Sequence, residues 1–165
     1  MPQQLSKEID LTCSPEGVNN WLADWTNIKA WMGPSLVDIT MLSDHDQNEP
    51  ICAGMRFRET RKMGKMNAKA TVEVEQHELK DGVLYHRAIF DDGCNRMISE
   101  YSYVPTESGS HATWTISNAP NKWWTRAMCK VTGPMMIKMM EKCEGDHLDR
   151  LKSLIEDQPN QHQAT

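Results

Sequence analysis

Three side chains are the best candidates for acid–base chemistry: His147, Glu59 and Arg61. His147 falls within an apolar helical stripe, so partial burial is expected to favour its neutral imidazole. Glu59 and Arg61 continue the inward alternation of a strand, either toward an interior or as a solvated pair at its rim. The sequence thus offers an imidazole, a carboxylate and a guanidinium for proton transfer. We favour a structural His147, bonded to a backbone carbonyl or a strand side chain.

A second group of residues is suited to lining an apolar pocket. Methionine is flexible and polarizable and fits adaptable binding surfaces, although it also fills irregular cores. Inward aromatic residues supply polar tips for specificity, and packing alone explains them equally well. The predicted pocket residues are Met55, Phe57, Val72, Tyr101, Tyr103, Trp114, Met128, Met136, Met140 and Cys143.

Several kinds of site lack a recognisable motif. The six histidines show no metal-ligand spacing, so no metal site is predicted. There is no nucleophile elbow, phosphate loop or dinucleotide fingerprint, so no cofactor is predicted either. Five cysteines without a C-x-x-C pair are expected to be reduced thiols. These observations weaken the case for an enzyme and leave it open.

The composition argues against two classes of partner. The 165-residue chain has 18 basic and 23 acidic residues and a net charge of −5, without the basic excess that nucleic-acid binding requires. No apolar run is long enough to span a bilayer, and the first ten residues do not resemble a signal peptide. We therefore expect a cytoplasmic protein with no nucleic acid and no transmembrane segment; a homodimer stays open.

The N-terminal region is predicted to form a strand followed by two short helices. Residues 9–13 alternate between apolar and polar, as a half-buried strand does. Ser14 and Pro15 are suited to the N-cap and first position of a helix. That helix presents Val18, Trp21, Leu22 and Trp25 on one apolar face. A second helix over residues 27–32 is expected to stop at Gly33-Pro34.

Residues 36–118 change to a period of two and predict six antiparallel strands joined by short turns. The clearest strand is 68–76, in which Ala68, Ala70, Val72 and Val74 should face the covered side. Residues 85–87 lie in a strand with apolar residues in both phases, so their faces cannot be assigned.

Residues 122–157 are helical in period and predict one long C-terminal helix. Gly133-Pro134 should kink or break it, since proline removes an interior hydrogen bond. Beyond that point His147 shares an apolar stripe with Leu151 and Leu154. The expected organisation is a single domain over 1–157 with a disordered polar tail at 158–165.

This order of elements gives an α+β fold in which the long helix covers a curved antiparallel sheet of about seven strands. The chain resembles the superfamily of START and birch-pollen-allergen-like domains, also called SRPBCC or polyketide cyclase/dehydrase domains. The resemblance covers the whole chain. It rests on the run from Cys13 to Val18, the run from Trp21 to Trp31, the run from Tyr101 to Pro105, and the run from His147 to Lys152 in the final helix. It implies a helix-grip fold with a cavity for lipids, sterols or polyketides, and it transfers no catalytic residue.

Three functions remain open at this stage. The leading one is binding or transport of an apolar or amphipathic small molecule, lipid or polyketide-like, in an internal hydrophobic cavity. The alternative is a cyclase, aromatase or hydrolase-like enzyme that uses His147 with Glu59, Arg61 or a tyrosine. The third is an interaction module similar to chaperone-activating domains, with Trp123 and Trp124 exposed as anchors.

Overall fold

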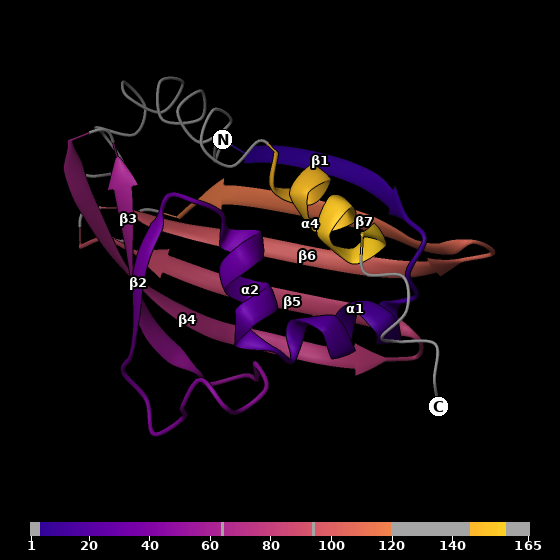
Figure 1. The fold of residues 1–165 in the computed structure, drawn as a ribbon, viewed down its shortest axis with the longest axis horizontal. Coiled ribbons are helices and arrows are strands. Elements are labelled where there is room, and N and C mark those ends of the chain that lie inside the picture. Colours follow the sequence, from indigo (N-terminus) through magenta and orange to yellow (C-terminus); the bar gives the residue numbers. More distant parts are fainter. Residues whose placement is uncertain (1–3, 64, 94, 120–145, 158–165) are drawn as a thin grey trace.

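The chain forms one antiparallel sheet with helices on one side of it (Figure 1). The computed structural model describes residues 4–63, 65–93, 95–119 and 146–157. The strands of the sheet are β1 (Gln4–Leu11), β2 (Leu36–Met41), β3 (Arg56–Met63), β4 (Met66–Lys80), β5 (Val83–Asp91), β6 (Arg96–Thr106) and β7 (Gly109–Asn118). Their order is β1-β7-β6-β5-β4-β3-β2. The predicted α+β helix-grip fold and its six-stranded meander are confirmed.

Two short helices connect β1 to the meander. Helix α1 (Pro15–Leu22) has Ser14 at its N-cap, where the hydroxyl accepts a hydrogen bond from the amide of Gly17. Helix α2 (Trp25–Met32) has Asp24 at its N-cap and ends at Gly33. The second helix therefore begins two residues earlier than predicted, and Trp25 belongs to it, because Asp24 caps a new helix.

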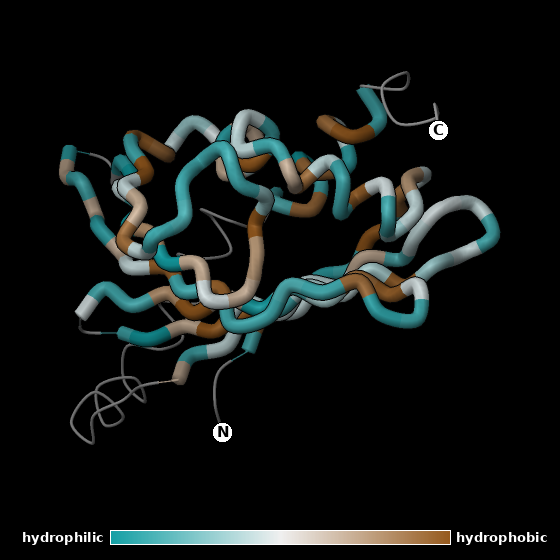
Figure 2. Tube along the Cα trace, turned by 90° about the horizontal axis from the view of Figure 1, so that it is seen from below, coloured by the Kyte–Doolittle hydropathy of each residue, from teal (hydrophilic) through white to brown (hydrophobic). Residues whose placement is uncertain are grey.

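The helices define an inner and an outer face of the sheet. Helix α1 packs against β4, β5 and β6, and the strand residues beneath the helices are buried. Figure 2 shows short hydrophobic stretches alternating with hydrophilic ones along the trace, as expected for strands covered on one face. The largest fully buried side chains include Trp21, Trp114, Tyr103, Met55 and Leu84. The core thus lies between the inner face and the helices.

A bulge in β4 changes which residues face inward. Val72 and Val74 are buried as predicted, but Ala68 is exposed because it lies near the end of the hairpin with β3. Between Val74 and Gln76 the register with β5 shifts, and a bulge of this kind reverses the side-chain alternation. As a result His77, rather than Gln76, lies opposite the inward-facing His86.

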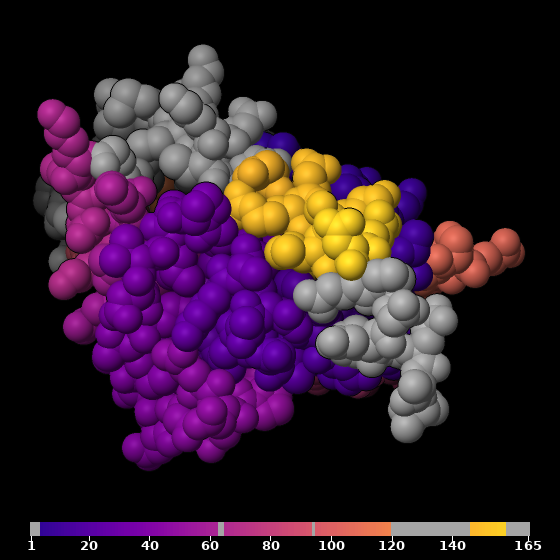
Figure 3. Space-filling model, in the orientation of Figure 1, coloured from indigo at the N-terminus to yellow at the C-terminus, as the bar shows by residue number. Residues whose placement is uncertain are grey.

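The C-terminal helix of the described residues is α4 (His147–Glu156), which packs against α2 and β1. Figure 3 shows it in yellow beside the indigo and violet N-terminal elements. Its buried residues are His147, Leu148, Leu151 and Ile155, whereas Leu154 is only partly buried. The predicted periodicity runs through residue 146, but the structure has a turn at Asp146 directly before the helix.

Several predictions concern residues outside the described part of the chain. They include the helical start at 122, the break at Gly133-Pro134, the anchors Trp123 and Trp124, and the polar tail at 158–165. The pocket candidates Met128, Met136, Met140 and Cys143 also lie there. Among the described helices, none is long and apolar enough to cross a membrane.

Candidate functional site

His147 lies at the first turn of α4 and is held by residues from two other elements. Its imidazole stacks on the indole of Trp31, with ring centroids 4.5 Å apart, and its backbone carbonyl accepts a hydrogen bond from Trp31 Nε1 at 3.0 Å. The Tyr101 hydroxyl lies 3.0 Å from His147 Nδ1. Helix α2 and strand β6 therefore fix both the backbone and the ring of His147.

Burial makes His147 a weak base. Burial first, and then the positive charges of Arg61 and Arg150, together lower the pKa of His147 to about 3. At neutral pH the imidazole is therefore uncharged. A general base works best when its pKa lies near the operating pH, so this environment suits hydrogen bonding and packing better than proton abstraction.

Glu59 and Arg61 form a buried ion pair beneath the end of α2. Arg61 Nε donates to Glu59 Oε1 at 3.0 Å, and the two side chains are only 15% and 6% exposed. Arg61 Nη1 also donates to the Met32 carbonyl and to the Ser35 hydroxyl, at 3.1 and 3.2 Å. The pair is thus interior, and the solvated rim considered from the sequence is not what the structure shows.

The end of α2 joins the two candidate groups. Arg150 donates to the Trp31 carbonyl at 2.9 Å, while Arg61 donates to the carbonyl of Met32. Cations are favourable at the C-terminal end of a helix, where carbonyls lack intrahelical partners. Gly33 follows with φ +83°, and a Cβ at this position would collide with the Arg150 guanidinium. Two arginines from β3 and α4 therefore meet on one helix end, next to His147.

Two buried oxygen atoms on the inner face have no hydrogen-bond partner among the described residues. They are Glu59 Oε2 and the Tyr103 hydroxyl. Burial also raises the pKa of Tyr103, so its hydroxyl keeps its proton. A buried polar atom left unpaired costs on the order of 1–3 kcal/mol. These two atoms are therefore the clearest places where an additional polar group would be stabilised.

A histidine pair on the inner face was missed by the sequence reasoning. The Nδ1 atoms of His77 and His86 lie 3.1 Å apart, and His77 Nε2 lies 3.1 Å from Asn19 Oδ1 of α1. Because Asn19 Oδ1 can only accept, His77 donates from Nε2 and accepts at Nδ1, so His86 donates from Nδ1. Burial lowers the pKa of both residues, that of His86 to about 3. Both rings are therefore neutral.

The signal for this pair was present in the turn that joins β4 and β5. Asp81 and Gly82 have φ of +52° and +77°, as a two-residue type I′ hairpin requires. Such a turn places Lys80 opposite Val83 and, three steps further, His77 opposite His86. Counting outward from the turn would have identified the pair.

The predicted pocket residues within the described chain all lie on the inner face of the sheet, except Met55, which directly precedes β3. They are well buried: Met55, Phe57, Val72, Tyr101, Tyr103 and Trp114. Trp25 contacts Phe57 edge-on, and Trp114 Nε1 donates to the Ser99 hydroxyl at 2.8 Å. The structure thus brings these six together with the ion pair and His147 over one face.

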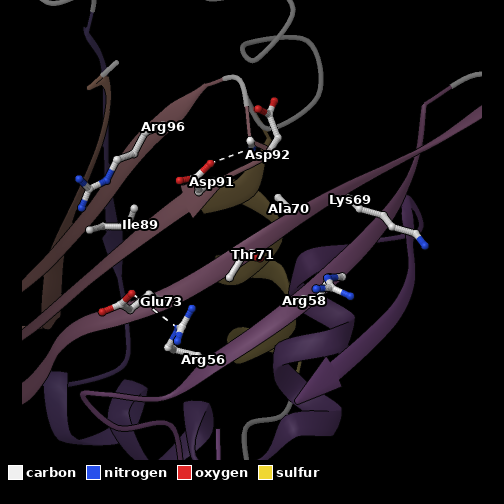
Figure 4. Close-up of a pocket in the computed structure, with 11 residues that line it drawn as sticks. Arg56, Arg58, Lys69, Ala70, Thr71, Glu73, Ile89, Asp91, Asp92 and Arg96 are labelled. Carbon is white, nitrogen blue, oxygen red and sulfur yellow. Dashed lines mark hydrogen bonds and ion pairs between the residues drawn. The ribbon is translucent and has the colours of Figure 1, made fainter. Parts of the chain in front are cut away.

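A groove of about 510 Å³ lies on the opposite, outer face of the sheet. Figure 4 shows Arg58 and Lys69 at one side of it and Asp91 and Arg96 at the other. Its lining is charged, unlike the apolar interior that the sequence predicts. As for metals, no group of three histidine, cysteine, aspartate or glutamate side chains in the described chain is arranged to hold an ion.

Comparisons with solved structures establish the fold. The Zhui aromatase/cyclase from a Streptomyces species superposes with a TM-score of 0.70 at 10% identity, covering 100% of both chains. TTHA0849 from Thermus thermophilus gives 0.69 at 14% identity, covering 96% of this chain and 100% of that one. Ara h 8.0201 gives 0.62 at 8% identity, covering 95% and 99%.

Sequence comparison identifies the family. None of the curated proteins compared with this chain matches it. The family model described as polyketide cyclase/dehydrase and lipid transport matches residues 2–156. Because that match spans nearly the whole chain and the helix-grip fold agrees with it, the protein belongs to the polyketide cyclase/dehydrase and lipid transport family.

Proposed function

We propose that this protein binds an apolar or amphipathic small molecule between the inner face of the sheet and the C-terminal segment. The observation that carries the proposal is the pair of unpartnered buried oxygens, Glu59 Oε2 and the Tyr103 hydroxyl, on a face whose buried residues are mainly apolar and aromatic. A ligand whose polar group reaches these atoms would remove their desolvation cost, while its apolar part contacts the aromatic side chains. The family description supports the same assignment.

Native mass spectrometry of the freshly purified protein, beside its denatured mass, tests this function. We expect a reproducible extra mass that disappears on denaturation. Tyr103→Phe and Glu59→Gln should reduce the fraction of protein that retains it, because each variant alters an atom assigned to the ligand. Tyr85→Phe is the matched control, since Tyr85 is 42% exposed. A clean apo mass for wild type, with lipid and polyketide-like extracts added, would contradict the proposal.

An enzyme of the cyclase or hydrolase type is the second candidate. One observation favours it: the charge of Arg61 acts on His147, so the imidazole, the guanidinium and Glu59 share one neighbourhood. With a pKa of about 3, His147 would orient a substrate by hydrogen bonding. The Tyr101 hydroxyl, which hydrogen-bonds to His147 Nδ1, would hold the imidazole in place. If His147→Ala leaves the turnover of every substrate found unchanged, this candidate is eliminated.

A further inference from the structure

The hairpin of β3 and β4 concentrates positive charge in an acidic protein. Residues 56–69, the basic hairpin, carry six of the 18 basic residues and only one of the 23 acidic residues, Glu59. Their formal charge is +5, which leaves −10 on the rest of a chain whose total is −5. Since Glu59 is buried against Arg61, the exposed charges of the basic hairpin are all positive.

The strand register gathers three of these cations on the outer face. Lys69 pairs with Thr60, whereas Arg58 and Lys62 are the next outward residues of β3 on either side of Thr60. Lys69 is therefore the diagonal neighbour of both, at about 7–8 Å between backbones. Thr60 between them is only 9% exposed. Like charges at this spacing repel and reduce stability.

No carboxylate in the described chain neutralises this cluster. Arg58, Lys62, Lys65 and Lys69 form no ion pair with the described residues, although Arg56 lies 3.7 Å from Glu73. On the neighbouring hairpin, by contrast, Arg87 pairs with Glu75 and Glu100, both at 2.8 Å. In Figure 4 Arg58 and Lys69 lie across the groove from Asp91. An external anion would relieve the repulsion.

Met66, next to Lys65 in the sequence, indicates which kind of anionic partner suits the basic hairpin. Met66 is 73% exposed, the highest exposure among the large apolar residues of the described chain. An exposed methionine next to Lys65 suits a membrane surface, where the thioether enters the interface and the ammonium groups reach phosphates. Single-stranded nucleic acid would call for stacking aromatics, but the only aromatic residue in the basic hairpin is Phe57, which is buried.

We propose that the basic hairpin docks this protein onto membranes that contain anionic phospholipid. The lysines and Arg58 contact lipid phosphates, and Met66 inserts between headgroups. Docking depends on charge and on Met66, and it is independent of whether the interior holds a ligand. Binding should therefore weaken with added salt, which screens exposed charges.

Vesicle co-sedimentation of the full chain tests this surface. Wild type should bind vesicles of equimolar phosphatidylcholine and phosphatidylglycerol at low salt and fail to bind phosphatidylcholine alone. Lys62→Glu/Lys69→Glu should lose about 25-fold or more in affinity, at about five-fold for each cation removed from an anionic surface. Lys29→Glu/Lys80→Glu makes the same charge change at exposed lysines elsewhere and should lose far less. Equal losses, or no binding by wild type, would overturn the proposal.

A third variant separates a membrane from other anions. Met66→Ser leaves the charge unchanged and should weaken vesicle binding about three-fold or more, because burial of the methionine is lost. Inorganic phosphate at the same ionic strength as sodium chloride should compete no better than chloride. An unaltered affinity of Met66→Ser, or tighter binding to double-stranded DNA than to vesicles, would refute membrane docking. Unchanged melting temperatures would exclude misfolding as the cause of any loss.

Discussion

On the inner face of the sheet His86 is buried and its pKa falls to about 3, whereas His111 on the outer face of β7 behaves in the opposite way. A hydrogen bond of 2.7 Å to Asp10 raises the pKa of His111. The difference between the two histidines follows from solvent: desolvation penalises the charged ring inside, and carboxylates stabilise it outside. The same sheet therefore shifts the pKa of one residue type in opposite directions on its two faces.

Charged pairs follow the same division. The inner pair, Glu59 and Arg61, is desolvated and completed by the carbonyl of Met32. Removing one partner of such a pair strongly destabilises a protein, because the other partner is left as an unpaired buried charge. Apart from Arg56, which lies 3.7 Å from Glu73, the outer cations of the basic hairpin are exposed and form no ion pair with the described residues. The charged groups of the inner face are thus part of the folded core, whereas the outer cations of the basic hairpin remain available for binding.

Removing an aromatic side chain should distinguish the faces most strongly. Trp114 is 1% exposed and donates to the Ser99 hydroxyl, so Trp114→Ala creates a cavity and leaves Ser99 without its donor. We expect it to lower the free energy of unfolding by about 3–5 kcal/mol. Tyr85→Ala on the outer face should change it by about 0.5 kcal/mol or less. Urea denaturation measures both; similar losses would show that the inner face is not the core.

Acid should destabilise the protein through its inner histidines. Both His86 and His147 have folded-state pKa values near 3, below the 6.5 of a free histidine. The unfolded chain therefore binds more protons than the folded one between those values. The stabilisation that these two neutral histidines provide is fully present above about pH 6.5. It is lost as the pH falls toward 3, at up to about 1.4 kcal/mol per pH unit for each histidine.

Histidine variants test the assignment of this pH dependence. In His86→Gln the free energy of unfolding should fall less steeply from pH 6.5 to 5, because His86 no longer contributes to the decline. Urea denaturation at each pH measures this. In His111→Gln the free energy of unfolding should fall more steeply toward acid. The raised pKa of His111 stabilises the fold at low pH, and the variant lacks this contribution. A His86→Gln curve parallel to wild type would mean that His86 is protonated in the folded state.

The sequence predicted the fold more completely than the site. Alternation and the Ser14-Pro15 start located the helices and strands because these signals are local. The inward direction of Glu59 and Arg61 also followed from alternation, but their burial did not. It depends on the Met32 carbonyl and on Ser35, which lie far away in sequence.

The histidine pair shows why local reasoning fails at one point. Extending the alternation of Val72 and Val74 places Gln76 inward and His77 outward. The bulge before Gln76 reverses this order, and a single extra residue has no distinct sequence signature. Counting outward from the Asp81-Gly82 turn pairs His77 with His86, and the burial of His86 then contradicts the simple alternation. That conflict is the evidence for a bulge.

The smallest expected effect is on the outer face, where a charge reversal should increase stability. Lys69→Glu replaces repulsion with attraction toward Arg58 and Lys62, its diagonal neighbours. Cross-strand pairs of opposite charge contribute about 0.2–1 kcal/mol, so the free energy of unfolding should rise by a few tenths. The gain should shrink in high salt, as expected for exposed charges. A destabilised Lys69→Glu would mean that Lys69 already has a stabilising partner, and the basic hairpin would then no longer differ from the ion-paired hairpin beside it.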